Sequence, residues 1–286
     1  MEERLIALPG VRLHAVVAGE GPLVVLLHGF PDHWRVWRHQ IDMLVAAGFR
    51  VVAPDLRGYN LSDKPLGVEP YRLTALVDDV AALIGALGSQ RAFVVGHDWG
   101  GVVAWHLAVR RPDRVERLAI LNAPHPFLDW ALLGPEQWLR SWHIGFFQLP
   151  WLPELALGAF DYALLRGLYA HASTRPGTIT ALDVEQSIAA ISRPGALTAA
   201  LNYYRAVPRN LSEGQAAVRV DLPVLVLWGE RDPMLGPAMA APGPGQAPQL
   251  ALLRRPDAGH WIQLDLPGWV GDRLVAFGRQ AKVEAT

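Results

Sequence analysis

The chain has 286 residues, of which 51% are hydrophobic and 19% charged, so it is large and apolar enough for one α/β domain carrying an insertion. Its 26 basic and 27 acidic residues give a net charge of −1, which excludes the strongly basic surface expected of a nucleic-acid-binding protein. The absence of cysteine excludes disulfides and thiolate metal sites.

The N-terminus begins with acidic residues and lacks the basic start and apolar stretch of a signal peptide. No apolar run approaches the ~20 residues that are needed to cross a bilayer. We therefore expect a cytoplasmic protein with neither a membrane nor a nucleic acid as its partner. The sequence leaves open whether the protein is a monomer or a dimer.

The first half of the chain alternates strand-like and helix-like segments. Apolar runs predict strands at 13–17, 23–27, 49–52, 92–95 and 118–121. Helix-like segments at 34–47, 74–87 and 101–109 are predicted as helices, and the helical spacing of apolar residues is clearest at 74–87. Apolar strands alternating with helices are typical of a mostly parallel sheet covered on both faces.

The alternation stops after Asn122. Residues 124–218, called the insertion below, contain helix-like and loop-like stretches but no convincing strand. They are rich in aromatic residues: Trp130, Trp138, Trp142, Phe146, Phe147, Trp151, Tyr203 and Tyr204. Strands return at 224–227 and 250–253, and a helix is expected near 270–277. We therefore predict an α/β core in two parts, residues 1–123 and 219–286, separated by a helical domain at 124–218.

The segment FVVGHDWGG at 93–101 runs from a buried strand through a turn into a helix. Asp98 is flanked by small residues in the pattern of a nucleophile elbow, Gly-x-nucleophile-x-Gly. Glycines are needed there because the turn is tight and a β-carbon would clash. The alternative is an aspartate that only caps the helix, and the glycines at 96, 100 and 101 favour the elbow. The helix dipole favours an anion at this position, so we expect Asp98 to be ionised at neutral pH.

A carboxylate nucleophile implies a particular chemistry. By attacking carbon it displaces a leaving group and forms an alkyl ester on the enzyme. This suits substrates with an electrophilic sp³ carbon, such as epoxides and alkyl halides, rather than ordinary esters. Water must then cleave the ester with help from a general base. His260 is predicted as that base, because elbow enzymes carry nucleophile, acid and histidine in this order along the chain; a surface-loop histidine is the alternative.

The acid that orients this histidine is expected at the end of the strand at 224–229. Asp232 is the predicted residue, which would fix the tautomer of His260 and stabilise its imidazolium form. Glu230 and Asp257 are competitors. Glu230 has the character of a solvated loop residue, and a residue as close in sequence to the histidine as Asp257 rarely points at the imidazole.

The loop His28-Gly29-Phe30-Pro31 follows a buried strand. In elbow hydrolases this loop gives one backbone N–H to the oxyanion hole, and the residue after the nucleophile gives the other. The predicted donors are therefore Phe30 and Trp99. The Phe30–Pro31 peptide bond is a candidate for the cis form. Without the elbow, the loop motif alone would indicate no more than a turn.

Along nearly its whole length the chain resembles the epoxide hydrolases of the α/β-hydrolase superfamily. The matching stretches are HGFPDHW at 28–34, PDLRGYNLSDKP at 54–65, GHDWGG at 96–101 and GHW at 259–261. The resemblance implies the α/β-hydrolase fold, with a mostly parallel sheet, flanking helices and a helical cap. It also implies that nucleophile, acid and base are Asp98, Asp232 and His260, and that epoxides are converted to vicinal diols.

In that family the cap supplies two residues, usually tyrosines, that hydrogen-bond the epoxide oxygen and protonate the leaving alkoxide. Tyr204 matches the second of them. At the first position this chain has His143, which resembles a minority branch with a His/Tyr pair. An imidazole N–H can donate as a phenol does, although neutral imidazole is a weaker acid than phenol and imidazolium a much stronger one. The alternative is a histidine that only packs within the cap.

The aromatic insertion suggests an apolar pocket and a small hydrophobic epoxide as substrate. We expect the pocket to be lined by Trp34, Trp142, Phe147 and Tyr203. No metal or organic cofactor is implied, because both chemical steps need only side chains and water.

Two other functions stay open. A haloalkane or haloacetate dehalogenase would share the Asp nucleophile, and an indole such as that of Trp99 can cradle a halide. However, haloalkane dehalogenases typically carry Asn where this chain has Phe30, and haloacetate dehalogenases typically carry Arg where it has Trp99. Halides also leave unprotonated and do not need Tyr204. A non-catalytic binding protein on this scaffold is the remaining alternative, although none of the three predicted catalytic residues is missing.

Overall fold

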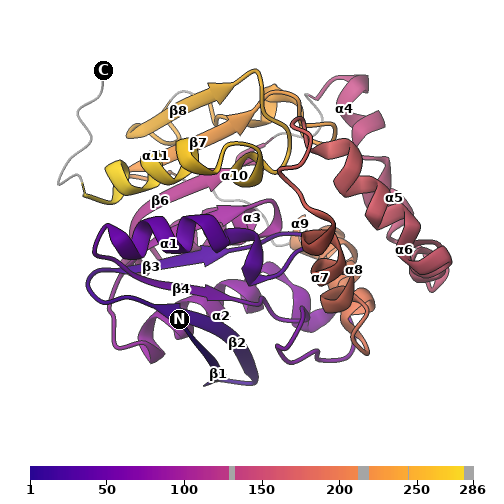
Figure 1. Cartoon of the computed structure of the whole chain (residues 1–286), viewed down its shortest axis with the longest axis horizontal. Coiled ribbons are helices and arrows are strands. Elements are labelled where there is room, and N and C mark those ends of the chain that lie inside the picture. Colours follow the sequence, from indigo (N-terminus) through magenta and orange to yellow (C-terminus); the bar gives the residue numbers. More distant parts are fainter. Residues whose placement is uncertain (129–132, 212–218, 244, 280–286) are drawn as a thin grey trace.

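The computed structural model describes residues 1–128, 133–211, 219–243 and 245–279. Trp130 and the last residues of the insertion, 212–218, lie outside these ranges. The described residues form an eight-stranded sheet in the order β1-β2-β4-β3-β5-β6-β7-β8 (Figure 1). Its strands are β1 (Glu2–Leu8), β2 (Val11–Ala18), β3 (Leu23–Leu27), β4 (Arg50–Pro54), β5 (Ala92–His97), β6 (Val115–Leu121), β7 (Val224–Gly229) and β8 (Leu250–Arg255).

The sheet is mostly parallel, as the sequence predicts. β2 pairs antiparallel with β1 and with β4, and all other neighbours are parallel. The central strands β3, β5 and β7 are buried along their whole length, which explains their continuous apolar runs. β1 is absent from the predicted strands because it lies exposed at the edge of the sheet and has no buried face to impose an apolar pattern.

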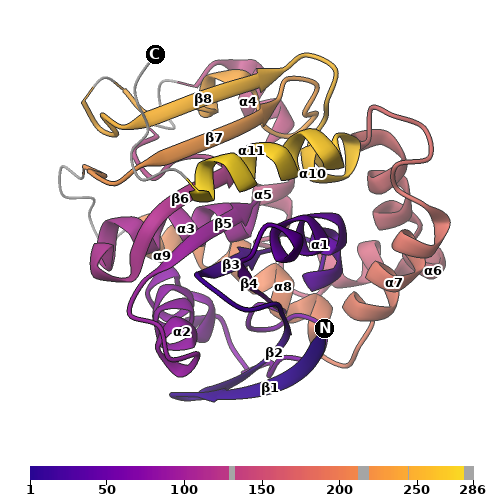
Figure 2. The ribbon, with the colours of Figure 1, turned by 60° about the vertical axis from the view of Figure 1, so that its left-hand side comes forward.

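Helices cover both faces of the sheet. α1 (Arg38–Ala46) and α11 (Pro267–Arg279) pack on one face, with the four-residue helix α10 (Ile262–Asp265) beside α11 (Figure 2). α2 (Leu73–Ala86) and α3 (Trp99–Arg110) pack on the other. The helix predicted at 34–47 is a 3₁₀ turn, Trp34–Trp37, followed directly by α1.

The strand order places a topological switch point between β3 and β5. From β3 the chain passes to β4 on one side, and it then crosses back to place β5 on the other side of β3. Loops that leave the carboxyl ends of β3 and β5 therefore diverge, and such a crevice is where open α/β sheets bind ligands. The loop at 28–31 and Asp98 follow these two strands.

The insertion lies between β6 and β7 in the chain, and its described residues contain helices but no strand. They are α4 (Pro135–Arg140), α5 (Trp142–Phe146), α6 (Leu152–Ala172), α7 (Ala181–Ile191), α8 (Ala196–Arg205) and α9 (Val207–Leu211). In Figure 1, α5 to α8 stand beyond the carboxyl ends of the central strands. α8 is fixed to the core by the Tyr203 hydroxyl, which donates to the Arg57 carbonyl at 2.7 Å. No helix in the described ranges is both long enough and apolar enough to cross a membrane.

Candidate active site

Asp98 occupies the joint between β5 and α3. Its φ of 51° and ψ of −124° are rare for an L-residue, and strain of this kind persists only where the surroundings enforce it. A β-carbon on Gly100 would overlap the carbonyl oxygen of Leu27, and one on Gly96 would overlap the carbonyl of Gly100. The two glycines therefore let β5, α3 and the end of β3 approach closely enough to present Asp98 at the carboxyl edge of the sheet.

Two backbone N–H groups bind the Asp98 carboxylate. Phe30 N–H donates to Oδ1 at 2.8 Å, and the N–H of Trp99 also hydrogen-bonds the carboxylate. Both predicted oxyanion-hole donors thus converge on one side chain. Burial raises the pKa of Asp98, while the charge of His260 and these two N–H groups act in the opposite direction. The side chain is 18% exposed, so a small molecule can reach it.

The loop that carries Phe30 is itself held in place. His28 Nε2 accepts the N–H of Leu56 at 3.0 Å, which ties this loop to the segment after β4. The Phe30–Pro31 peptide bond is cis, as the sequence led us to expect.

The structure brings His260 and Asp232 together beside Asp98. His260 Nδ1 donates to Asp232 Oδ2 at 2.7 Å, which leaves Nε2 to face Asp98. Nε2 lies 3.7 Å from Asp98 Oδ2, too far for a direct hydrogen bond. Burial by itself lowers the pKa of His260, but the charge and hydrogen bond of Asp232, together with the charges of Asp98 and Asp32, raise it to about 9.

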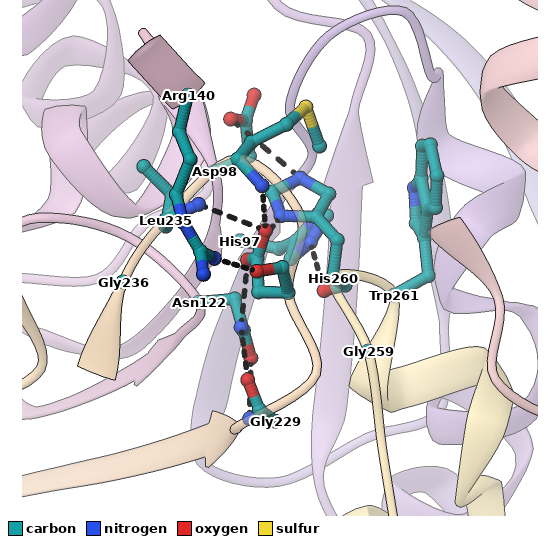
Figure 3. Close-up of polar contacts among 12 residues, drawn as sticks. His97, Asp98, Asn122, Arg140, Gly229, Leu235, Gly236, Gly259, His260 and Trp261 are labelled. Atoms are coloured by element: carbon teal, nitrogen blue, oxygen red, sulfur yellow. Dashed lines mark hydrogen bonds and ion pairs between the residues drawn. The ribbon is translucent and has the colours of Figure 1, made fainter. Parts of the chain in front are cut away.

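Asp232 is buried, and its carboxylate oxygens accept hydrogen bonds from three groups besides His260. Oδ1 accepts the N–H groups of Met234 and Leu235 at 2.8 and 3.0 Å, and Oδ2 accepts Asn122 Nδ2 at 2.8 Å. Asn122, directly after β6, also exchanges two hydrogen bonds with the backbone of Gly229 at the end of β7 (Figure 3). Asn122 is absent from the residues that the sequence predicts, although its place at the end of a strand was an available signal.

The competitors for the role of acid point elsewhere. Glu230 is about one-third exposed and faces Arg254, and Asp257 pairs with Arg255 and Arg175. Neither has a contact with His260 among the described residues.

Two further groups beside His260 are also missing from the sequence-based prediction. His97, the last residue of β5, donates from Nε2 to the backbone carbonyl of His260 at 3.0 Å (Figure 3), and burial holds its pKa well below the usual value. Asp32 accepts Trp261 Nε1–H and the Tyr169 hydroxyl, each at 2.7 Å, and burial raises its pKa to about 6. Both roles depend on contacts between segments that are distant in the chain.

Tyr204 of α8 lies close enough to Asp98 for the carboxylate charge to affect its pKa. Its ring packs against Phe30, Trp99 and Phe147, with ring centroids 4.9 to 5.6 Å apart. Burial, reinforced by the charge of Asp98, raises the pKa of Tyr204 well above its ordinary value, and a hydrogen bond with the Trp99 indole acts in the opposite direction. The phenol therefore keeps its proton at neutral pH and is available as a donor.

His143 of α5 stands beside Tyr204, with ring centroids 5.9 Å apart. Its Nδ1 lies 3.2 Å from the Arg140 carbonyl, and a carbonyl only accepts, so Nδ1 carries the hydrogen. Burial lowers the pKa of His143. The neutral ring therefore has a bare Nε2, and His143 can donate a second hydrogen bond only as an imidazolium.

The four residues expected to line the pocket differ in their positions. Phe147 is buried and contacts Phe30, His143 and Tyr204. Of the other three, Trp142 is 65% exposed and Trp34 packs with the core on the α1 side of the sheet. Tyr203 packs against Trp99, with ring centroids 5.5 Å apart, and its hydroxyl donates to the Arg57 carbonyl.

Comparisons with known proteins show which family the chain resembles. The family model of the alpha/beta hydrolase fold matches residues 22–267. AB hydrolase superfamily protein YfhM of Bacillus subtilis is 43% identical, over 94% of both chains. Human Epoxide hydrolase 4 is 37% identical, over 94% of this chain and 76% of that protein. The crystal structure of a Bacillus megaterium epoxide hydrolase with an inhibitor superposes with a TM-score of 0.89 at 32% identity, over 97% of this chain and 100% of that one.

The raised pKa of His260 predicts a pH-dependent stability. Its folded-state pKa of about 9 lies above the unfolded value of 6.5, so the folded protein holds this proton more tightly. The resulting stabilisation is complete below about pH 6.5 and is lost as the pH rises through about 9. We therefore expect the free energy of unfolding, measured in urea, to decrease over this interval. His260→Gln removes the titrating group and should flatten the decrease; an equally steep decrease in this variant would contradict the assignment.

Proposed function

Since the chain belongs to the α/β-hydrolase fold family and, within it, to the epoxide hydrolases, we propose that it opens epoxides through an alkyl ester on Asp98 and releases vicinal diols. The observation that carries this proposal is the position of one carboxylate. Asp98 lies 3.7 Å from His260, which is paired with Asp232, and its two N–H donors belong to Phe30 and Trp99, on whose rings the protonated phenol of Tyr204 packs.

In the first step, Asp98 attacks a ring carbon of the epoxide and the C–O bond breaks. The backbone N–H groups of Phe30 and Trp99 hold the carboxylate in place for this attack. Tyr204 gives its proton to the departing ring oxygen, which remains attached to the substrate as a hydroxyl group. His143 assists as a second donor when it is protonated.

In the second step, water attacks the ester carbonyl while His260 takes a proton from it. The charged form of His260 cannot do this, but ester formation removes the negative charge of Asp98, one of the groups that raise the pKa of His260. The tetrahedral oxyanion forms where the N–H groups of Phe30 and Trp99 can stabilise it. Collapse transfers the His260 proton to the diol, and the carboxylic acid of Asp98 returns its proton to Tyr204.

The surroundings of Asp98 support a hydrophobic epoxide as the substrate. The rings of Phe30, Trp99, Phe147 and Tyr204 are buried and pack on one another beside the carboxylate. The same arrangement disfavours dehalogenation, because the Trp99 indole is engaged with Tyr204 rather than left to bind a halide.

Trapping the ester tests the covalent step. His260→Gln keeps the nucleophile and removes the base, so brief mixing with styrene oxide should raise the mass of the intact protein by one substrate unit. The double variant Asp98→Asn/His260→Gln should remain unmodified. If wild type converts the epoxide but His260→Gln gains no mass, the covalent mechanism is wrong. Release of chloride from a chlorinated alkane without any epoxide turnover would instead identify a dehalogenase.

Tyr204→Phe tests the proton donor. It removes the hydroxyl group and keeps the ring, so the rate of alkylation should fall by ~10²–10⁴-fold, the usual contribution of a positioned acid. Tyr203→Phe is the matched control, because the neighbouring hydroxyl binds the Arg57 carbonyl instead of facing Asp98. Single-turnover kinetics with excess enzyme measure the step directly. Equal losses in the two variants would remove Tyr204 from the proposed mechanism.

His143 should leave a signature in the pH dependence of alkylation. Because it donates only when protonated and its pKa is lowered from the usual 6.5, its assistance should grow as the pH falls below about 6.5. His143→Tyr should stay active and lose this dependence, because a phenol is protonated throughout the range. His143→Phe loses the second donor at every pH. Identical profiles for wild type and His143→Phe would show that His143 only packs within the insertion.

A further inference from the structure

The two residues that flank His260 in the chain are each hydrogen-bonded to a different buried aspartate. On one side, the backbone N–H of Gly259 donates to Asp265 Oδ2 at 2.7 Å. On the other, the indole N–H of Trp261 donates to Asp32 Oδ2 at 2.7 Å. The mechanism above uses neither aspartate, and Figure 3 shows Gly259 and Trp261 next to His260.

Asp265 is 2% exposed, and the hydroxyl groups that satisfy it come from the insertion. Ser173 Oγ donates to Oδ1 at 2.8 Å, Thr174 Oγ1 to Oδ2 at 2.9 Å, and Thr178 Oγ1 to Oδ1 at 3.3 Å. All three residues lie in the loop between α6 and α7. A buried carboxylate needs such donors. Asp265 therefore links two loops, because it accepts hydrogen bonds both from the α6–α7 loop and from Gly259 in the loop that carries His260.

The last turn of α6 reaches the other flank of His260. The Tyr169 ring stacks on Trp261, with centroids 4.7 Å apart and planes 28° apart, and its hydroxyl donates to Asp32 at 2.7 Å. The insertion therefore contacts the histidine loop at a buried point on each side of the base. It also contacts the loop at Asp257, which forms an exposed ion pair with Arg175.

Within the histidine loop, each of three consecutive residues has one backbone group fixed by a hydrogen bond. Arg231 N–H donates to the Ala258 carbonyl at 3.0 Å, Gly259 N–H donates to Asp265, and His97 donates to the His260 carbonyl at 3.0 Å. Only the middle bond ends on a carboxylate, and hydrogen bonds to an ionised partner are roughly twice as strong as neutral ones. Asp265 is therefore the strongest single restraint on the backbone next to the base.

We propose that Asp265 is a positioning residue for His260. Because Ser173 and Thr174 of the insertion donate to Asp265, the docking of the insertion on the core then affects the rate at which the alkyl-enzyme ester is hydrolysed. The inference rests on the proposed function, in which His260 acts only in the second step. A displaced imidazole slows attack by water, whereas Asp98 attacks the epoxide without it. Loss of Asp265 should therefore separate the two steps kinetically.

The test compares alkylation and hydrolysis in Asp265→Ala, Asp265→Asn and the double variant Ser173→Ala/Thr174→Val. Single-turnover kinetics and quenched-flow mass spectrometry with styrene oxide give both rate constants. In Asp265→Ala, hydrolysis should slow by ~10–10²-fold, the cost of a misplacement of about 1 Å, while alkylation is unchanged and the ester accumulates. Asp265→Asn, which keeps one acceptor oxygen, and the double variant should show the same pattern with a smaller loss.

Asp257→Asn is the matched control. This carboxylate belongs to the same loop and also contacts the insertion through Arg175, but it is 37% exposed and does not bind the Gly259 N–H, which donates to Asp265. Both steps should therefore be unchanged. Equal slowing of alkylation and hydrolysis in the Asp265 and double variants, or hydrolysis at the parental rate, would overturn the proposal. If Asp265→Ala does not fold, Asp265→Asn and the double variant decide the question. Failure of His260→Gln to form any ester would refute the proposed function itself, separately from the role of Asp265.

Discussion

The rest of the site depends on the electrostatic interaction of His260 with two carboxylates, Asp232, to which it is hydrogen-bonded, and Asp98, 3.7 Å away. The three residues follow the ends of β7, β8 and β5, and only the sheet brings them together. Asn122 and two backbone N–H groups bind the oxygens of Asp232, so its side chain can point at His260 in a buried setting. The carboxylates, in turn, raise the pKa of His260 despite its burial.

The same N–H groups serve two species in succession. In the resting site, those of Phe30 and Trp99 bind the Asp98 carboxylate; in the proposed reaction they would stabilise the oxyanion formed on the same carbon. No rearrangement of the backbone is needed between the steps, which is the preorganisation that makes such sites effective. In the proposed reaction, the main electrostatic change between the steps would be at His260, because the ester would no longer carry the charge of Asp98 that favours the protonated imidazole.

The sequence predicts best what local sterics and burial determine. The elbow is readable because its glycines follow a fixed spacing around the nucleophile position, and β3 and β5 are readable because continuous burial demands apolar runs. The atoms that require Gly100, the carbonyls of Leu27 and His28, are distant in the chain and become visible only in the structure. Asn122, His97, Asp32 and Asp265 escape prediction because their partners are distant in the chain or lie in the insertion.

Neighbouring residues on one helix show a second limit. Tyr203 and Tyr204 are chemically identical and adjacent, yet one hydroxyl binds the core backbone and the other ring faces Asp98. Only the docking of α8 on the core decides between them. Trp142 and His143 differ in the same way, because the orientation of α5 leaves the indole exposed and turns the imidazole toward Tyr204.

The crowding around Gly96 and Gly100 has a consequence for how such an enzyme can diversify. The atoms that a β-carbon would meet there are backbone atoms, most of them in carbonyl groups, and they cannot rotate away as a side chain can. Mutational libraries aimed at new substrates should therefore leave the elbow untouched and vary insertion positions such as Phe147, whose ring packs on Phe30 and Tyr204 and can be replaced without changing the backbone of the elbow. The backbone of the elbow is therefore expected to stay constant among related enzymes, while the insertion residues that contact the substrate can vary.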